Sequence, residues 1–217
     1  MIYLTLEQKL FLIIAPVVLL IILFLLLFFP IKKRVLKNKY KELCYKKLYD
    51  LVENEDYYLI NNFNFNIGNS RVAHIDHIVF GDKYIYVINS HYYNGDIMGK
   101  VDDPSLIVIP KKGDKYYSEN PIITNKFLAS RLSVVTSLEP SYLVGINVVN
   151  DECRISIDSQ SAQFFIIQRS KVCELIKNIE SRPIGKLDPQ ALDTAVQEIY
   201  KMNIKEEDGK PVTKSSN

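Results

Sequence analysis

The sequence predicts an α/β fold with a mixed central sheet, preceded by one transmembrane helix. Two observations support this expectation. Positions 10–29 form an uncharged apolar run, and the chain after it orders its elements as helix, three strands, helix and strand, followed by shorter strands and helices. Strands interleaved with helices are typical of a sheet that helices cover. The part after residue 31 has the length of one ordinary domain.

The transmembrane helix is expected from the length and composition of the apolar run. Its twenty residues would span roughly 30 Å as a helix, the thickness of a bilayer's hydrocarbon core. No small-residue cleavage site follows, so residues 1–31 are predicted to be an uncleaved anchor. Basic residues cluster at 32–41, which places the C-terminal domain in the cytoplasm of a single-pass cell-membrane protein. This stretch is either a topology signal alone or also a contact for anionic lipid.

Charge and cysteine content exclude several classes of protein. The 27 basic and 25 acidic side chains nearly cancel, giving a net charge of +2, which excludes a strongly basic nucleic-acid binder of the histone kind. The three cysteines lie far apart without a CxxC pair. This spacing argues against a zinc ribbon and against a disulfide framework.

The elements of the domain are predicted in order from periodicity and turn residues. The first helix is expected at 34–53, where leucines and valines form one apolar stripe. Gly81-Asp82 is a tight turn that joins the second and third strands into a hairpin. Asn120-Pro121 opens the second long helix, and Asp188-Pro189 caps the last one. The expected strands are 57–65, 72–80, 83–89, 105–109, 142–149, 153–158 and 162–168, and the other helices are 121–138, 170–179 and 189–202.

The chain is divided accordingly into five parts. They are an anchor at 1–31, a basic juxtamembrane segment at 32–37, a first domain region at 38–140, C-terminal strands and helices that complete the domain at 141–203, and a disordered tail at 204–217. Residues 110–120 are expected to be a polar loop whose lysines, Lys111, Lys112 and Lys115, form a solvated tip.

The second and third strands carry a dense group of polar residues inside apolar segments. Alternation along a strand places His74 and Asp76 on one face and His77 on the other. Asn89 and His91 share a face of the next strand. We therefore expect Asp76 to meet Asn89 and His91 across the hairpin, and His77 to pack or hydrogen-bond on the opposite face.

These residues resemble a known family. The segments HIDHIVF from His74, YVINSH from Tyr86, Asn94-Gly95 and Asn120-Pro121 are similar to the NERD, or nuclease-related, domain. That family reads T-[QE]-I-D-H-I-V, then V-I-E-x-K, then G and N-P-x-x-Q, and N-terminal membrane anchors occur in it, mostly in bacteria. The resemblance covers about residues 38–140. It implies a restriction-endonuclease-like core of the PD-(D/E)xK superfamily, with the order helix, three strands, helix, strand.

The resemblance also implies where a nuclease would hold its metal. Asp76 matches the metal-binding aspartate, and Glu42 is a candidate for an N-terminal glutamate on the first helix. Asn89 stands where the family has glutamate, and His91 where it has lysine. Magnesium prefers anionic oxygen ligands, and an amide carries no charge. Histidine is mostly neutral at pH 7 and replaces a fixed positive charge poorly.

The sequence leaves several functions open. The leading one is a catalytically degenerate scaffold or interaction module at the cytoplasmic membrane face, needing no cofactor. The first alternative is a membrane-tethered nuclease that uses Mg²⁺ or Mn²⁺ to cleave DNA or RNA, with Glu42 as a further ligand. The second is a nucleic-acid-binding module that does not cleave. A transition-metal site formed by His74, Asp76 and His91 is a separate hypothesis.

Overall fold

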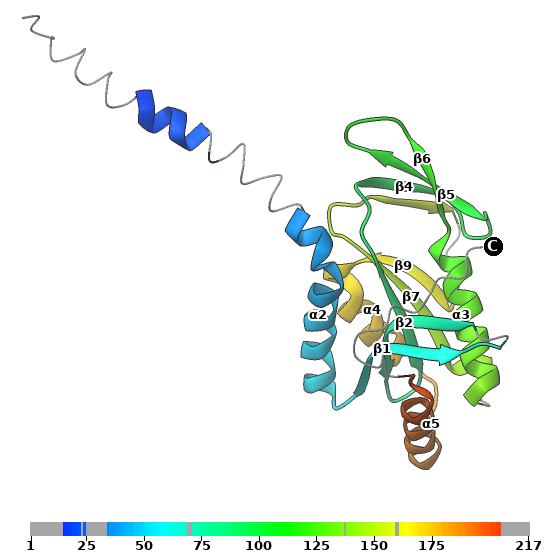
Figure 1. The fold of residues 1–217 in the computed structure, drawn as a ribbon. Helices are drawn as coiled ribbons and strands as arrows, with labels where there is room; N and C mark the ends of the chain where they lie inside the picture. The colour runs from blue at the N-terminus through cyan, green and yellow to red at the C-terminus, as the bar shows by residue number, and fades with distance from the viewer. Residues whose placement is uncertain are drawn as a thin grey trace, which may run out of the picture. The chain divides into compact units, whose positions relative to one another are not determined.

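The computed structural model describes residues 15–22, 24, 34–68, 71–136, 138–158 and 161–204 (Figure 1). The chain divides into two compact units, Met1–Tyr40 and Lys41–Asn217. The described residues of the first unit are helical at 15–22, 24 and 34–38. Much of the predicted anchor, and all but the first residue of the predicted tail at 204–217, lie outside the described residues. No helix within the described ranges combines the length and hydropathy that crossing a membrane requires.

The second unit has the mixed α/β composition that the sequence predicts. Its helices are α2 (Tyr40–Glu55, all but the first residue in this unit), α3 (Pro121–Thr136), α4 (Val172–Glu180) and α5 (Pro189–Met202), with 3₁₀ turns η1 (Pro140–Tyr142) and η2 (Arg169–Lys171). Its strands are β1 (Tyr58–Asn66), β2 (Val72–Phe80), β3 (Ile85–His91), β4 (Gly95–Lys100), β5 (Ser105–Pro110), β6 (Tyr116–Glu119), β7 (Leu143–Val149), β8 (Ile155–Asp158) and β9 (Phe164–Gln168). Every helix and strand predicted for this unit has a counterpart here.

The strands form two sheets. The larger is mixed, with order β1-β2-β3-β7-β9, antiparallel between β1, β2 and β3 and parallel from β3 to β9. The smaller has order β6-β5-β4-β8. The sequence predicts one central sheet, no strand at 95–100 and a loop at 110–120, whereas the structure has a second sheet with β4 and β6 there, so these expectations are wrong. Glycine is usually a sign of a turn or loop, but Gly95 lies in a strand because β4 and β5 approach closely there. A Cβ at this position would collide with the Ile109 carbonyl oxygen.

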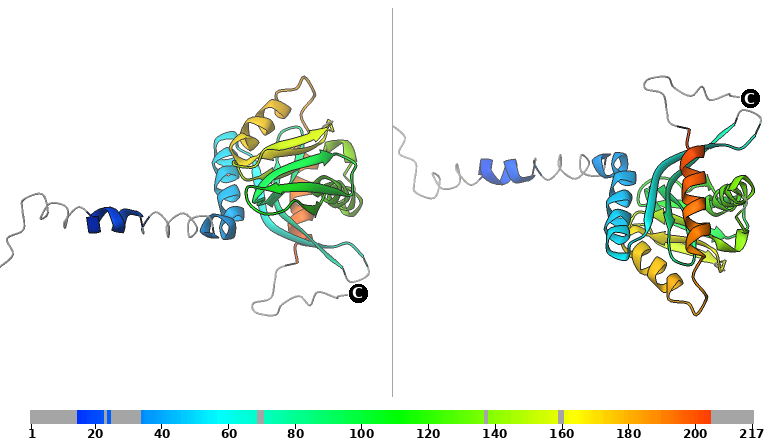
Figure 2. Two further views of the ribbon diagram at one scale, coloured as in Figure 1. Left: turned by 90° about the horizontal axis from the view of Figure 1, so that it is seen from above. Right: turned by 90° about the horizontal axis from the view of Figure 1, so that it is seen from below.

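Helices cover both faces of the larger sheet. Two views at right angles to Figure 1 show α2 and α4 on one face and α3 and α5 on the other (Figure 2). The main apolar core lies between the sheet and α3 and α5, and includes Phe63, Ile78, Phe80, Val87, Leu128, Leu132 and Ile199. A second cluster lies under the smaller sheet and includes Ile97, Leu106, Val108 and Ile166. The main core includes side chains of both β2 and β3, the two strands that carry the polar group.

Candidate functional site

The candidate site lies where β2 and β3 stop pairing through their backbones. The register of backbone pairs runs from Phe80 and Ile85 to His77 and Ile88. Beyond it, the Asp76 N–H donates to Asn89 Oδ1 at 3.1 Å. The Ser90 N–H donates in turn to Asp76 Oδ2 at 2.8 Å. These two side chains satisfy backbone donors that the ladder no longer serves, and the prediction that Asp76 and Asn89 meet across the hairpin is confirmed.

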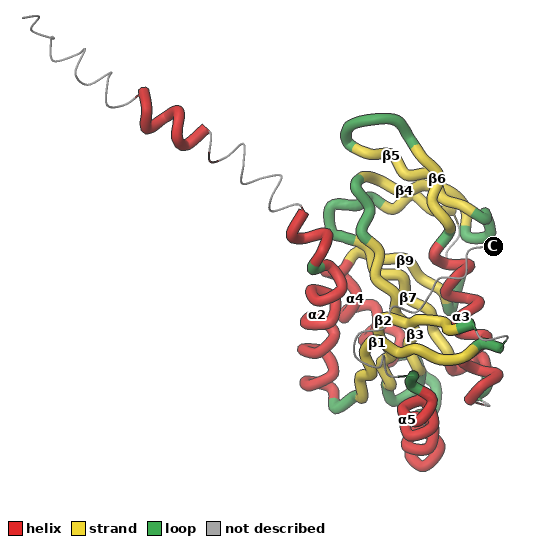
Figure 3. The backbone as a smooth tube through the Cα atoms, in the orientation of Figure 1, coloured by secondary structure: helices red, strands yellow, loops and turns green. Residues whose placement is uncertain are grey.

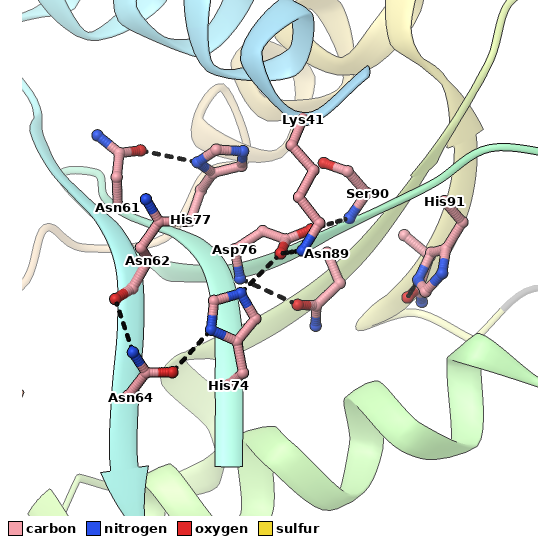
Figure 4. A network of polar contacts seen from close by, with 11 residues as sticks. Lys41, Asn61, Asn62, Asn64, His74, Asp76, His77, Asn89, Ser90 and His91 are labelled. Carbon is pink, nitrogen blue, oxygen red and sulfur yellow. Dashed lines mark hydrogen bonds and ion pairs between the residues drawn. The ribbon is translucent and has the colours of Figure 1, made fainter. Parts of the chain in front are cut away.

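The other carboxylate oxygen of Asp76, Oδ1, contacts two further side chains. Lys41 Nζ lies 2.6 Å and His74 Nε2 3.0 Å from Asp76 Oδ1, and Asp76 itself is only 3% exposed. Figure 4 shows this carboxylate surrounded by Lys41, His74 and Ser90. Burial alone would raise the pKa of Asp76, but the hydrogen bonds from His74, Lys41 and the Ser90 N–H lower it well below its usual range. Asp76 is therefore an ionised carboxylate whose charge is balanced within the chain.

His91 lies in the same region but does not contact Asp76 through its ring. Its Nε2 is 3.2 Å from Oδ1 of the fully buried Asn147, in β7. Figure 4 shows the ring set apart from the cluster around Asp76. Burial lowers the pKa of His91, against a smaller opposing effect of the Asn147 hydrogen bond. The imidazole is therefore neutral at pH 7.

Glu42 is not brought to this cluster. Its exposed carboxylate pairs with Lys46, one helical turn further along α2, at 3.2 Å. The preceding residue in the helix, Lys41, is the one that reaches Asp76.

The polar residues line a cavity of about 290 Å³. Its walls come from α2, β2, β3, β7 and α3, and its lining residues are Lys41, His74, Asp76, Asn89, Ser90, His91, Pro121, Thr124, Leu128 and Asn147. Sequence reasoning missed Lys41, which was counted with the basic stretch at 32–41. It also missed Asn147, although a polar residue inside the apolar segment 142–149 was a usable signal.

His77 lies on the opposite face of β2, as predicted. Its Nδ1 is 2.7 Å from Asn61 Oδ1, and its ring stacks on Tyr45 with centroids 6.4 Å apart. Burial lowers the pKa of His77 to about 4. His77 is therefore a neutral core residue and contributes nothing to the cavity.

The donor set does not fit a divalent cation. Asp76 is the one carboxylate lining the cavity, and its oxygens are engaged by Lys41, His74 and Ser90. Asn89 Oδ1 accepts the Asp76 N–H. In the part of the chain that the structure describes, no three His, Cys, Asp or Glu side chains are grouped to hold a metal. His91 pairs with Asn147, so this structure does not bring the three side chains of the predicted His74–Asp76–His91 site together.

Fold and site together define a mixed α/β domain, consistent with a nuclease-like core, in which polar residues gather at the ends of β2 and β3. The sequence matches the Nuclease-related domain (NERD) over residues 37–149, and the chain therefore belongs to this family. Membership indicates a nuclease-related function. No curated protein matches the chain.

A solved structure titled "Crystal Structure of Protein of Unknown Function AF1548" resembles it at 15% identity and a TM-score of 0.33, covering 72% of this chain and 78% of that one. A likeness this low carries no argument about the fold or the site.

Proposed function

We propose that this protein is a catalytically degenerate NERD domain that serves as a scaffold or interaction module at the cytoplasmic face of the cell membrane. The observation that supports this proposal is the engagement of both Asp76 oxygens by Lys41, His74 and the Ser90 N–H. The aspartate that a nuclease would use for metal thereby joins α2, β2 and β3 to one another.

Electrostatics favours this reading over a metal-dependent nuclease. The single negative charge of Asp76 is already balanced by the Lys41 ammonium 2.6 Å away. A cation brought within about 4 Å of that ammonium would meet a repulsion of about 4 kcal/mol per unit of metal charge, before solvent screening at the partly exposed Lys41 reduces it. Asn89 offers no second anion to offset this repulsion.

The residue at the position of the family's motif lysine also supports a catalytically degenerate site. His91 stands there, and burial keeps its imidazole neutral. A neutral ring supplies no fixed positive charge beside a phosphate in the transition state, and loss of such a charge commonly lowers rates by orders of magnitude.

Membrane attachment is the second part of the proposal. The apolar run at 10–29 has the length of a bilayer span, and the basic residues at 32–41 favour a cytoplasmic domain. A cysteine introduced at Ser215 in intact cells tests this orientation. We expect this cysteine to be protected from an impermeant thiol reagent. Labelling of the cysteine would show that the domain faces the outside of the cell.

A nuclease assay with the full chain in detergent tests the degenerate site. We expect no cleavage of single- or double-stranded DNA or RNA above background with Mg²⁺ or Mn²⁺. The matched control is Asp76→Asn, which keeps the shape of the side chain and removes its charge. Cleavage by the wild type that this variant abolishes would establish the alternative, a membrane-tethered metal-dependent nuclease. Binding without cleavage that falls steeply with salt would establish a nucleic-acid-binding module.

A further inference from the structure

The outer face of the smaller sheet carries an apolar row near the β5–β6 hairpin tip, with Asp96, Lys100, Glu119 and Asp158 at other positions of the same face. Across this sheet Met98 pairs with Ile107 and Ser156, and Ile107 pairs with Tyr117, so the side chains of this row share one face. Met98 is 40%, Ile109 44% and Tyr117 69% exposed. The solvent face of an antiparallel sheet is normally polar. The apolar row of Met98, Ile107, Ile109 and Tyr117 is therefore the part of this face that a contact could cover.

The loop at the end of the same hairpin is basic. Residues 111–117 are all exposed, as predicted for a solvated tip. They include Lys111, Lys112 and Lys115 around Gly113, with Asp114 as the one acidic residue. None of the three lysines makes an ion pair with another residue that the structure describes. Figure 3 shows this loop extending beyond the strands of the smaller sheet.

We propose that the tip of the β5–β6 hairpin and the adjoining apolar row on the outer face of the smaller sheet dock on an anionic lipid surface. This hairpin surface is defined by Met98, Ile109, Lys111, Lys112, Lys115 and Tyr117. Its positive tip complements anionic headgroups, at about 1 kcal/mol for each lysine near the membrane. Tyrosine is enriched at the membrane interface, and the aliphatic side chains gain by leaving water.

The composition of the hairpin surface favours lipid over nucleic acid. Single-stranded nucleic acid is bound by rows of aromatic rings on which bases stack. Met98 and Ile109 have no aromatic ring, and Tyr117 alone offers one on this face. The choice of a membrane also rests on the proposed anchor, which would keep the domain close to lipid.

Amide hydrogen exchange of the full chain in lipid nanodiscs tests this proposal. We expect slower exchange of residues 107–117 in discs containing phosphatidylserine than in discs of phosphatidylcholine alone, with the rest of the domain unchanged. Replacing Lys111, Lys112 and Lys115 by Gln should weaken the lipid-bound state roughly 100-fold and remove this protection. The matched control replaces three exposed lysines elsewhere, Lys47, Lys171 and Lys201, by Gln and should keep it.

Three results separate the competing explanations. Equal exchange in both kinds of disc overturns the lipid proposal. Protection by a single-stranded oligonucleotide in place of phosphatidylserine also overturns it, and makes the surface a nucleic-acid contact. If the full chain does not enter discs, the proposed membrane anchor is wrong. The same exchange measurement with added phosphatidylserine vesicles then still tests whether the hairpin surface binds anionic lipid.

Discussion

Asp76 and His77 are neighbours in β2, and both have lowered pKa values for different reasons. Burial of His77 disfavours its charged form and lowers its pKa to about 4. Burial of Asp76 acts in the opposite direction, but the hydrogen bonds from His74, Lys41 and the Ser90 N–H outweigh it. The two residues therefore govern different pH ranges. The stability that a neutral, buried His77 contributes is lost as pH falls from about 6.5 to about 4. The stability that an ionised Asp76 contributes is lost only as pH falls below about 4.

The first range predicts a loss of stability on mild acidification. The unfolded chain protonates His77 near pH 6.5, whereas the folded chain resists protonation until about pH 4. The free energy of unfolding should therefore fall as pH drops through this range, by up to about 1.4 kcal/mol per pH unit for each such histidine. Burial makes His91 contribute in the same direction.

Denaturant unfolding of wild type and His77→Gln between pH 8 and pH 4 measures the share of His77. The two curves of stability against pH should converge as pH falls, because Gln does not titrate. Parallel curves would contradict the assignment of a buried neutral His77.

At the scale of elements, Asn120 connects the start of α3 to the turn after β4. Its Nδ2 donates to the carbonyl oxygens of Lys100, Val101 and Asp103 at 3.1, 3.0 and 2.8 Å. Its Oδ1 accepts the Ile122 N–H at 3.0 Å as a helix N-cap. The Asn-Pro pair of the family motif thus has a structural role in this chain.

We expect Asn120→Ala to lower the free energy of unfolding by about 2–4 kcal/mol, because it removes the cap and the buried and part-buried hydrogen bonds to three carbonyl oxygens. Asn178→Ala, on the exposed side of α4, is the matched control and should change stability by less than about 0.5 kcal/mol. Thermal or denaturant unfolding of both variants measures the difference. Equal stabilities would show that the contacts of Asn120 are dispensable.

Local patterns predict most of this fold and only part of the site. Strand alternation places Asp76 and Asn89 on facing sides of one hairpin, but the predicted two-residue turn is wrong. Phe80 pairs with Ile85 across a connection formed by residues 81–84, and this register places Asp76 opposite Asn89, whereas the predicted turn would place it opposite Val87. The contact between Lys41 and Asp76 spans 35 residues, and no local periodicity encodes how α2 packs on β2. Strand β6, four residues long, pairs with β5 at the edge of the smaller sheet, so its conformation depends on its neighbour more than on its own sequence.

At the scale of the whole molecule, NERD membership indicates a nuclease-related function, while the site has one carboxylate tied to a lysine. The proposed function explains both facts if the fold is retained and its catalytic chemistry is lost. In this reading Lys41 occupies the side of Asp76 that a metal would need, and Asn89 supplies no second anion.

Binding of Mn²⁺ to the full chain, followed by electron paramagnetic resonance, tests whether Asp76 is available to a metal. We predict no saturable binding by the wild type up to millimolar Mn²⁺. The variant carrying Lys41→Gln, Asn89→Glu and His91→Lys should gain a site, and adding Asp76→Asn to it should remove that site. Saturable binding by the wild type that Asp76→Asn abolishes would show that the site is not degenerate, because Asp76 would then be a metal ligand despite its contact with Lys41.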